Sequence, residues 1–451
     1  MSAEPEPEAA GPKRPGMRRA AAGTYLSYLG VSFLGLLNVL IVARDLGPTG
    51  RGDVTFLMTV AGITGYVLNM SVHESNANFS GLKSHRIPSL GTNSVVLSLL
   101  LGLAAAGVAV AALAYAPFLK QDVPAGNLAL ALVSIPAVML QTYLVYLARG
   151  SYQFTVANIA MLTAPTVALT ANVVMMITGT LSVTTALAAW SAGNTLAALF
   201  LAVHHGLTAG YTRPDRRLAQ EAVTFGAKSH IGGVLATGNY RMDQWILGAV
   251  AGSRELGLYS IAVAWFEGLF LLPMAVSAVA RPDLVRAKGA EAGARIASLF
   301  RLTVALTLIA AVALFLLAPV LCTGIFGDSF SGSVEPLRLL AVGALGISAA
   351  KLIGIGLIAQ QRPLLESASM GTGFVVALVL YVILIPSYGA NGAAIASTIA
   401  YTAAGLAAAA FLVRQFDVRP SALIPRPSDA RQLADLVGAA GRNISGSLRR
   451  G

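Results

Sequence analysis

Five charged residues stand within or beside long apolar stretches of this sequence. They are Lys351, Arg241, Arg44, Asp243 and Glu267. A charge at the depth of a membrane is costly unless it is paired or hydrated, so each of the five is a candidate for function. Cations at such a depth can bind phosphate groups, and a carboxylate there can bind a proton or a sodium ion.

Lys351 lies in the middle of an apolar run, between Ala350 and Leu352, with no acidic residue within one helical turn. It is therefore the first candidate for a phosphate contact. Two alternatives remain open. The long side chain could reach the membrane surface, or it could pair with Asp243 from another helix.

Arg241 and Asp243 are two residues apart, so on a helix they point in different directions and cannot pair with each other. Each then needs a partner elsewhere. For Arg241 the candidates are a phosphate group of a ligand and a structural bridge between helices. Asp243 could couple to a proton or a sodium ion if it is buried, or it could form a fixed ion pair.

The other two charged candidates have simpler interpretations. Arg44 ends the first apolar run beside Asp45, so a pairing at the outer interface competes with a phosphate contact. Glu267 follows Trp265 and Phe266. It is either an acid in a cavity or a member of a hydrogen bond between helices.

The segments that carry these residues are too apolar for a water-soluble protein. The 451 residues are 56% hydrophobic and 11% charged, with a mean hydropathy of +0.71, whereas about a quarter of a soluble domain is charged. Apolar runs long enough to cross about 30 Å of hydrocarbon as helices recur from Tyr25 to Val413. Because they lack the alternation of barrel strands, the sequence predicts an all-α polytopic membrane protein.

Twelve spans are predicted, and the basic residues orient them. The spans are near 25–43, 54–72, 92–116, 127–148, 155–177, 182–204, 229–250, 257–280, 298–321, 337–358, 365–386 and 390–413. Lys and Arg concentrate in the tails and in alternate loops, with Arg149 and Arg362 in two short turns on that side and Arg51 on the other. Cytoplasmic loops carry such an excess, so both termini should be cytoplasmic. Topology then accounts for the net charge of +11 without nucleic acid as a partner.

Two stretches after the first and seventh spans indicate an internal repeat. Leu46-Gly47-Pro48-Thr49-Gly50-Arg51-Gly52 aligns with Ala251-Gly252-Ser253-Arg254-Glu255-Leu256-Gly257, so that Gly47 matches Gly252 and Gly52 matches Gly257 at one offset. The same offset pairs Asn38 with Asp243. Six spans separate the two sites, so the halves have the same orientation. This is a parallel repeat, of the kind whose interface holds a transporter's substrate.

Spans and repeat together divide the chain. We expect a cytoplasmic tail over 1–24, a six-helix bundle over 25–204, a cytoplasmic linker over 205–228, a second six-helix bundle over 229–413 and a cytoplasmic tail over 414–451. The single cysteine, Cys322, permits no intrachain disulfide.

No cofactor or metal is expected from the motifs. The glycines Gly47, Gly50 and Gly52 follow a membrane helix rather than a strand, which excludes dinucleotide-binding and P-loop interpretations. The histidines lack the two-turn spacing of a metal site, and His204 and His205 are adjacent.

Three motifs resemble the Wzx-like polysaccharide and oligosaccharide flippases of the multidrug/oligosaccharidyl-lipid/polysaccharide exporter superfamily. They are Arg44-Asp45-Leu46-Gly47-Pro48-Thr49-Gly50-Arg51-Gly52 after the first span, Arg241-Met242-Asp243 followed by Leu256-Gly257-Leu258-Tyr259-Ser260-Ile261-Ala262, and Pro386-Ser387-Tyr388-Gly389-Ala390-Asn391-Gly392-Ala393-Ala394 before the last. Their order and spacing carry the resemblance.

This resemblance implies two six-helix bundles around a central cavity that opens alternately inward and outward in a bacterial cytoplasmic membrane. It also implies an undecaprenyl-diphosphate-linked oligosaccharide as cargo, for cell-surface polysaccharide biosynthesis. Membrane lipids would surround the protein, with a polysaccharide polymerase and glycosyltransferases as possible partners. The alternatives are a lipid II flippase or a multidrug/cation antiporter on the same scaffold, and, more distantly, a polytopic glycosyltransferase or polymerase. Short external loops disfavour an enzyme.

Overall fold

The computed structural model describes residues 17–116 and 121–424, which form a succession of helices and contain no β-strand. The principal helices are α1 (Met17–Leu68), α2 (Val72–Leu82), α3 (Ile87–Tyr115), α4 (Ala125–Val133), α5 (Ile135–Gly150), α6 (Phe154–Ile177), α7 (Val183–Thr208), α8 (Arg216–Glu267), α9 (Leu271–Arg286), α10 (Gly289–Pro319), α11 (Val334–Ala359) and α12 (Pro363–Phe416). The predicted all-α class is confirmed for the described residues.

Three of these helices are too long to cross a membrane once, and each is broken at a glycine. Helices α1, α8 and α12 are 52, 52 and 54 residues long, whereas one crossing needs about 20 residues. The backbone leaves the helical conformation at Gly47, Gly252 and Gly389, where φ is 66°, 85° and 51°. Glycine adopts positive φ without the cost that a Cβ imposes. Each long helix therefore contains two crossings joined at its break.

Nine helices of the described chain are long and apolar enough to cross a membrane. Three of the nine count twice because of their glycine breaks, so the described residues contain the twelve predicted spans. The face where Gly47, Gly252 and Gly389 lie is called the kink face below. The opposite face, formed by α2 and the start of α8, is called the linker face.

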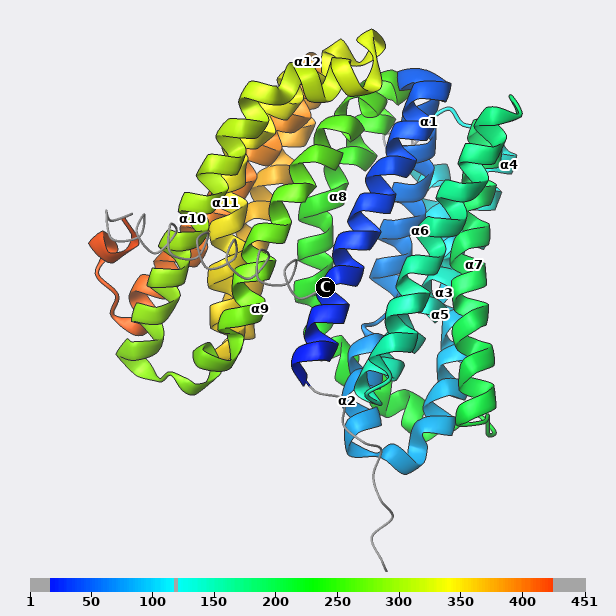
Figure 1. Ribbon diagram of the computed structural model, residues 1–451, viewed down its shortest axis with the longest axis vertical. Helices are drawn as coiled ribbons and strands as arrows, with labels where there is room; N and C mark the ends of the chain where they lie inside the picture. The colour runs from blue at the N-terminus through cyan, green and yellow to red at the C-terminus, as the bar shows by residue number, and fades with distance from the viewer. Residues whose placement is uncertain (1–16, 117–120, 425–451) are drawn as a thin grey trace, which may run out of the picture.

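The helices gather into two lobes (Figure 1). Helices α1 to α7 form the N-lobe, and α9 to α12 with most of α8 form the C-lobe. Helices α1 and α8 lie side by side at the junction of the lobes. The predicted arrangement of two helical bundles is therefore observed.

The repeat seen in the sequence returns as a reciprocal contact at this junction. A Cβ on Gly52 would overlap the carbonyl oxygen of Ser253, and a Cβ on Gly257 would overlap the carbonyl oxygen of Pro48. The alignment that matches Gly52 to Gly257 also matches Pro48 to Ser253. The two contacts are therefore equivalent: each glycine packs against the same position of the other repeat. A two-fold relation between parallel repeats produces such a pair of contacts.

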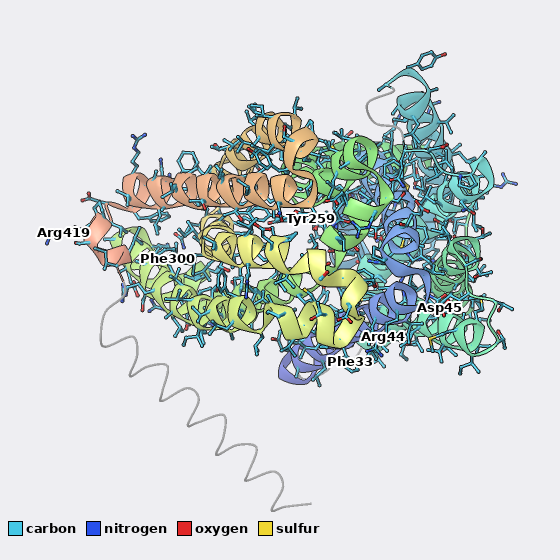
Figure 2. All side chains as sticks on the ribbon, turned by 90° about the horizontal axis from the view of Figure 1, so that it is seen from above. Phe33, Arg44, Asp45, Tyr259, Phe300 and Arg419 are labelled. Carbon is cyan, nitrogen blue, oxygen red and sulfur yellow. The ribbon has the colours of Figure 1, made fainter. Side chains whose placement is uncertain are left out.

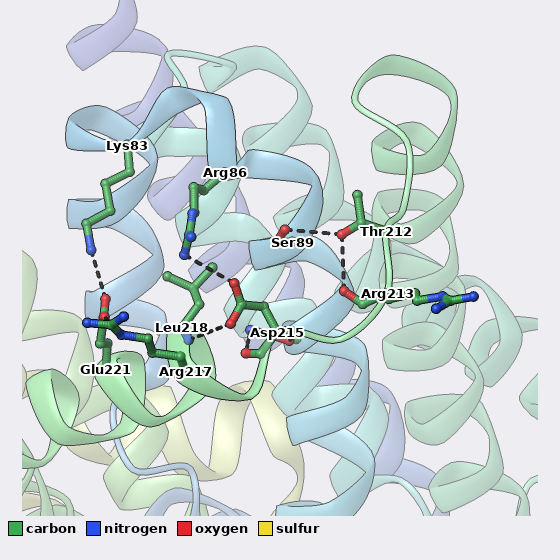
Figure 3. Close-up of polar contacts among 10 residues, drawn as sticks. Lys83, Arg86, Ser89, Thr212, Arg213, Asp215, Arg217, Leu218 and Glu221 are labelled. Atoms are coloured by element: carbon green, nitrogen blue, oxygen red, sulfur yellow. Dashed lines mark hydrogen bonds and ion pairs between the residues drawn. The ribbon is translucent and has the colours of Figure 1, made fainter.

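The predicted linker over 205–228 is mostly helical, unlike the loop that the sequence suggested. Helix α7 continues to Thr208 and α8 already begins at Arg216, after Asp215, whose Oδ1 accepts the backbone N–H of Leu218. The start of α8 is fastened to the N-lobe (Figure 3): Arg86 Nη1 lies 3.1 Å from Asp215 Oδ2, and Lys83 Nζ lies 2.9 Å from Glu221 Oε2. A capping aspartate and two ion pairs therefore make this segment part of the N-lobe.

The two expected tails are only partly described. Helix α1 begins at Met17, within the segment 1–24, and residues 1–16 lie outside the described residues. Helix α12 runs to Phe416, and a short turn at Pro420–Leu423 follows it. The Nη1 of Arg301 donates to the carbonyl of Ala422 over 2.7 Å, which ties this turn to the C-lobe. Residues 425–451 lie outside the described residues.

Candidate functional site between the lobes

A cavity of about 880 Å³ lies between the lobes and is lined from both sides. The N-lobe contributes polar side chains from α1, α5 and α7, and the C-lobe contributes the end of α8. The polar and aromatic lining residues are Ser32, Phe33, Asn38, Arg51, Gln141, Trp190, Asn194, Trp265 and Glu267. Arg51 and Glu267 are the charged members of this described lining. A polar space at the interface of two repeats is where transporters of this architecture bind substrate.

Arg241 and Glu267 form a bidentate ion pair at the C-lobe wall of the cavity. Nη1 of Arg241 lies 2.9 Å from Oε1 of Glu267, and Nη2 donates to Oε2 over 3.3 Å. The two residues belong to the two crossings of α8, which the Gly252 break folds against each other. The side chains of Arg241 and Glu267 are 42% and 31% exposed. The pair is thus a bridge between spans, as one interpretation predicted, and its Glu267 lines the cavity.

Arg51 is buried at the junction of the lobes, although the sequence placed it in an outer loop. Arg51 is 9% exposed, and its Nε donates to Oγ of Ser260 across the junction over 3.2 Å. It is close enough to Arg241 for the two positive charges to repel each other. The N-lobe and the C-lobe therefore each supply one arginine to the region around the cavity.

Lys351 lies between two aromatic rings of the C-lobe. Its Nζ is 4.4 Å from the ring centroids of Tyr240 and Phe270. Tyr240 precedes Arg241 in the chain, and Phe270 lies one turn beyond Glu267. Cation–π contacts stabilise an ammonium group without neutralising it. The expected alternative of an ion pair with Asp243 is wrong, since Asp243 has other partners.

Asp243 is sealed inside the C-lobe and does not face the cavity. The residue is 1% exposed, Oδ2 accepts the hydroxyl of Tyr259 over 2.7 Å, and Oδ1 accepts the backbone N–H of Gln244 over 2.7 Å. The labelled Tyr259 lies deep among the helices in Figure 2. One turn away, the fully buried Asn239 has no hydrogen-bond partner for either side-chain atom among the described residues. The fixed ion pair expected for Asp243 is not found in this part of the chain.

Arg44 lies apart from this group, at the kink face. Its Nε donates to the carbonyl of Ile325 in the C-lobe over 2.8 Å. Figure 2 shows Arg44 next to Asp45 on the edge of the same helix, but the bond to Ile325 replaces the expected pairing with Asp45. Arg44 thus helps to hold the two lobes together outside the cavity.

The structure therefore places Arg241, Glu267 and Lys351 in the C-lobe, with Arg241 and Glu267 paired, and adds Arg51, which sequence reasoning missed. A signal for Arg51 was present. Arg51 stands between Gly50 and Gly52. Gly52 lets the two backbones approach closely, and this approach also brings Arg51 to the interface between the lobes. Chemically, these residues offer two guanidinium groups, one ammonium group and one carboxylate, which suits an anionic group with several oxygens.

Two lobes related by a parallel repeat, with a polar cavity between them, define a class: multi-pass membrane proteins with the fold of the multidrug/oligosaccharidyl-lipid/polysaccharide exporter superfamily. The chain belongs to the family described as polysaccharide biosynthesis protein, whose sequence model matches residues 41–335. No curated protein matches the chain.

Solved structures with this fold are similar over most of their length. The lipid II flippase MurJ, in an inward closed conformation, is 13% identical with a TM-score of 0.72, and the match covers 88% of each chain. An inward-facing multidrug resistance MATE family transporter is 14% identical with a TM-score of 0.63, covering 87% of this chain and 98% of that one. A transporter of the same superfamily from Pyrococcus furiosus is 12% identical with a TM-score of 0.58, covering 89% and 95%. At these identities the likeness shows the fold.

Proposed function

We propose that the protein is a flippase that moves an undecaprenyl-diphosphate-linked oligosaccharide across the bacterial cytoplasmic membrane for cell-surface polysaccharide biosynthesis. The family description and the two-lobed fold support this proposal. The cavity would hold the sugar and diphosphate while the prenyl chain stays in the lipid.

The observation that carries the proposal is the sign of the charge at the cavity wall. Glu267 is the acidic residue of the described lining, and Arg241 binds both of its oxygens. Arg51 then remains as a cation of the opposite lobe whose described hydrogen-bond partner is a hydroxyl group, and Lys351 adds a cation in the C-lobe. A wall with a net positive charge attracts a diphosphate and repels a cationic drug, which favours the glycan carrier over a multidrug/cation antiporter.

The geometry of the two arginines suits this cargo. Guanidinium groups bind phosphate oxygens through two parallel N–H donors, which is stronger and more directional than a single ammonium contact. A diphosphate that approaches Arg241 competes with Glu267 for the same donors. Such competition would let the cargo bind tightly in one state of the cavity and leave in another.

Alternating access requires the lobes to part where they now touch. At the kink face they are joined by Arg44 to the carbonyl of Ile325, by Arg51 to Ser260, and by the glycine contacts with Ser253 and Pro48. We assign the linker face to the cytoplasm, because its loops carry the basic residues. Cargo made in the cytoplasm would then enter from the linker face and leave when the kink face opens.

Asp243 is the candidate for ion coupling within this proposal. It is a buried carboxylate whose described hydrogen-bond donors are a hydroxyl group and a backbone amide, and the nearby Arg241 is paired with Glu267 instead. A carboxylate in that setting takes up a proton or a small cation more readily than one in an ion pair. Binding there would alter the packing of the C-lobe rather than contact the cargo.

Deletion of the gene followed by analysis of lipid-linked oligosaccharides tests the proposal. Loss of a flippase strands complete repeat units on the cytoplasmic side and depletes the surface polymer. An enzyme that builds or polymerises the glycan would instead leave incomplete units or an accumulation of units outside. Lipid II flipping would appear as a defect in peptidoglycan precursors with normal surface polysaccharide. Either result would overturn the assignment.

Complementation then tests the residues. Variants Lys351→Ala, Arg241→Ala, Arg51→Ala and Asp243→Ala should each restore less surface polysaccharide than the wild type. Arg241→Lys keeps the charge and loses the planar fork, so it should fall between Arg241→Ala and the wild type. Full activity of all the alanine variants would remove this mechanism while leaving the fold intact.

A further inference from the structure

Arg149, which the sequence marked only as a basic residue of a short turn, turns inward rather than toward the membrane surface. It stands in the last turn of α5, at the linker face. Its Nη1 donates to the hydroxyl of Tyr28 over 3.0 Å, and Nη2 lies 2.8 Å from Sδ of Met161. An arginine that only anchors a helix end extends its head into water or among lipid headgroups. This one is held among α1, α5 and α6.

The charge of Arg149 is not neutralised by its described neighbours. The guanidinium carbon lies 5.3 Å and 5.7 Å from the ring centroids of Tyr28 and Tyr146, and Nε is buried without a hydrogen-bond partner. The acid of the neighbouring cavity, Glu74, lies 3.8 Å from Nε2 of His73. Other arginines near this face differ: Arg86, for example, pairs with Asp215.

The position of Arg149 is at the linker-face edge of the central cavity. Met161, its sulfur partner, lines that cavity, and so does Leu29, which follows Tyr28 in the chain. The other three cations, Lys351, Arg241 and Arg51, lie at increasing distance from the linker face. Lys351 is two turns from the end of α11, about 12 Å along the helix, Arg241 lies near the middle of its span, and Arg51 is beside the kink.

Lys351 is held in the C-lobe in a way similar to Arg149 in the N-lobe. Both stand on the fourth span of their half, α5 and α11, and both are held between two aromatic rings of which one belongs to the first span of that half: Tyr28 for Arg149 and Tyr240 for Lys351. Aromatic rings hold a cation in place while leaving its charge available. The structure thus repeats an aromatic-caged cation in each lobe, and in the described part of the chain neither cation is within 4 Å of a carboxylate oxygen, although Glu366 acts on Lys351 from farther away.

We propose that Arg149 is the loading site for the diphosphate of the lipid-linked cargo, the first of a series of cations that continues through Lys351, Arg241 and Arg51. This inference rests on the proposed function. The phosphates of a prenyl lipid lie at the depth of the membrane interface, because burial of their charge is costly. Arg149 is the member of the series at that depth, and none of its described partners is an acid.

Binding of farnesyl diphosphate to the full-length protein in nanodiscs of zwitterionic lipid tests this inference. Arg149→Gln should weaken binding about tenfold, the loss expected for a charged hydrogen bond. The same substitution should weaken the binding of farnesyl monophosphate less. The matched control is Arg362→Gln: Arg362 also stands at a short turn between two spans and also stacks on a ring, 5.7 Å from the centroid of Phe416. The difference is that Phe416 does not line the cavity, whereas Met161, the sulfur partner of Arg149, does. Arg362→Gln should bind as the wild type does.

The outcomes separate the inference from the proposed function. If the wild type does not bind farnesyl diphosphate at all, the proposed function fails and the inference fails with it. If Arg241→Gln and Lys351→Gln lose affinity while Arg149→Gln does not, only the loading site is overturned. If Arg149→Gln does not yield monodisperse protein, Arg149→Lys is tested in its place. Arg149→Lys should lose affinity for farnesyl diphosphate but not for farnesyl monophosphate. Unchanged affinity for both ligands would overturn the loading site.

Two further ligands distinguish the sources of the phosphate chemistry. Inorganic pyrophosphate should compete with farnesyl diphosphate on the wild type and less on Arg149→Gln, which shows recognition of the diphosphate itself. Phosphatidylglycerol nanodiscs should leave the effect of Arg149→Gln in place. If that anionic lipid abolishes the difference between the variant and the wild type, Arg149 is a general lipid anchor and the inference is wrong.

Discussion

The two lobes share one backbone plan but differ in the charges that they carry inside. Gly47 and Gly252 break α1 and α8 in the same conformation, with φ of 66° and 85° and ψ near 180°. At another pair of equivalent positions, the N-lobe has Asn38, which accepts an N–H of Asn172 over 2.7 Å, whereas the C-lobe has the buried Asp243. The N-lobe interior uses an amide pair where the C-lobe uses a carboxylate.

This difference separates the parts of the molecule that form the scaffold from the parts that perform chemistry. Positions fixed by geometry, the glycines at the junction, are the same in both halves. Positions that could bind an ion or an anion are not. We infer that the repeat sets where the lobes touch, and that the C-lobe, with Asp243, Lys351 and the pair of Arg241 with Glu267, carries most of the charge-dependent function.

The largest predicted effect tests the shared geometry. Gly52→Ala and Gly257→Ala each place a Cβ on a backbone carbonyl of the other lobe, which side-chain movement cannot relieve. Each should destabilise the protein by about 3 kcal/mol, seen as a lower Tm in detergent. The two losses should be similar, because the contacts are related by the repeat.

Gly62→Ala is the control for that experiment. Gly62 also lies in α1, and a Cβ there meets nothing within 4 Å. This variant should match the wild type or gain slightly in Tm, since alanine is the better helix former. A loss at only one of the two junction glycines would show that the junction is not symmetric.

The next prediction tests the difference between the lobes. Arg241→Ala removes both donors from Glu267 and leaves a carboxylate at the cavity wall, so transport of the lipid-linked glycan in proteoliposomes should fall about 100-fold. Asn38→Ala removes one neutral hydrogen bond in the N-lobe and should lower transport less than about tenfold. Equal losses would mean that the N-lobe interior is as important for transport as the C-lobe wall.

A smaller effect is expected from Asp243→Asn. The amide still accepts the hydroxyl of Tyr259, which donates to Oδ2 in the wild type, but it cannot be ionised. Transport driven by an ion gradient should fall about tenfold, whereas exchange of cargo without a gradient should be nearly unchanged. Equal losses in both assays would indicate a packing defect in place of ion coupling. Tm of the purified variant serves as the control for packing.

Much of the fold could be predicted from sequence because its causes are local. The span count follows from apolar length, and the breaks at Gly47 and Gly252 follow from glycines that recur at one offset. The linker was only partly foreseen. Its second half is helical because Asp215 caps α8 and because Leu218 and Ala222 are buried against the N-lobe, and such burial depends on tertiary contacts.

The candidate site was harder to predict, since its partners are distant in the chain. The charges Arg241, Glu267 and Lys351 could be chosen from their depth alone, but which of them pair depends on how α8 folds back at Gly252. Arg51 was assigned to a loop because it lies between two spans, and its burial results from contact with Ser260 of the other half. The position of a charged residue along its span can be inferred from the sequence, whereas its contacts with the other lobe cannot.

The smallest predicted effect concerns the linker, which is fastened to one lobe by charge. Donation from Lys83 to Oε2 of Glu221 lowers the pKa of this carboxyl below its usual value. A lowered pKa means that the ion pair contributes stability at neutral pH and that this contribution is lost as pH falls through the folded-state pKa. Wild-type protein should therefore exceed Glu221→Gln slightly in Tm at pH 7, and the difference should shrink as the pH is lowered below about 4.3, the usual glutamate pKa. The effect is small because both side chains are 38% exposed. A difference that stays constant with pH would show that the side-chain shape of Glu221, and not its charge, holds α8 on the N-lobe.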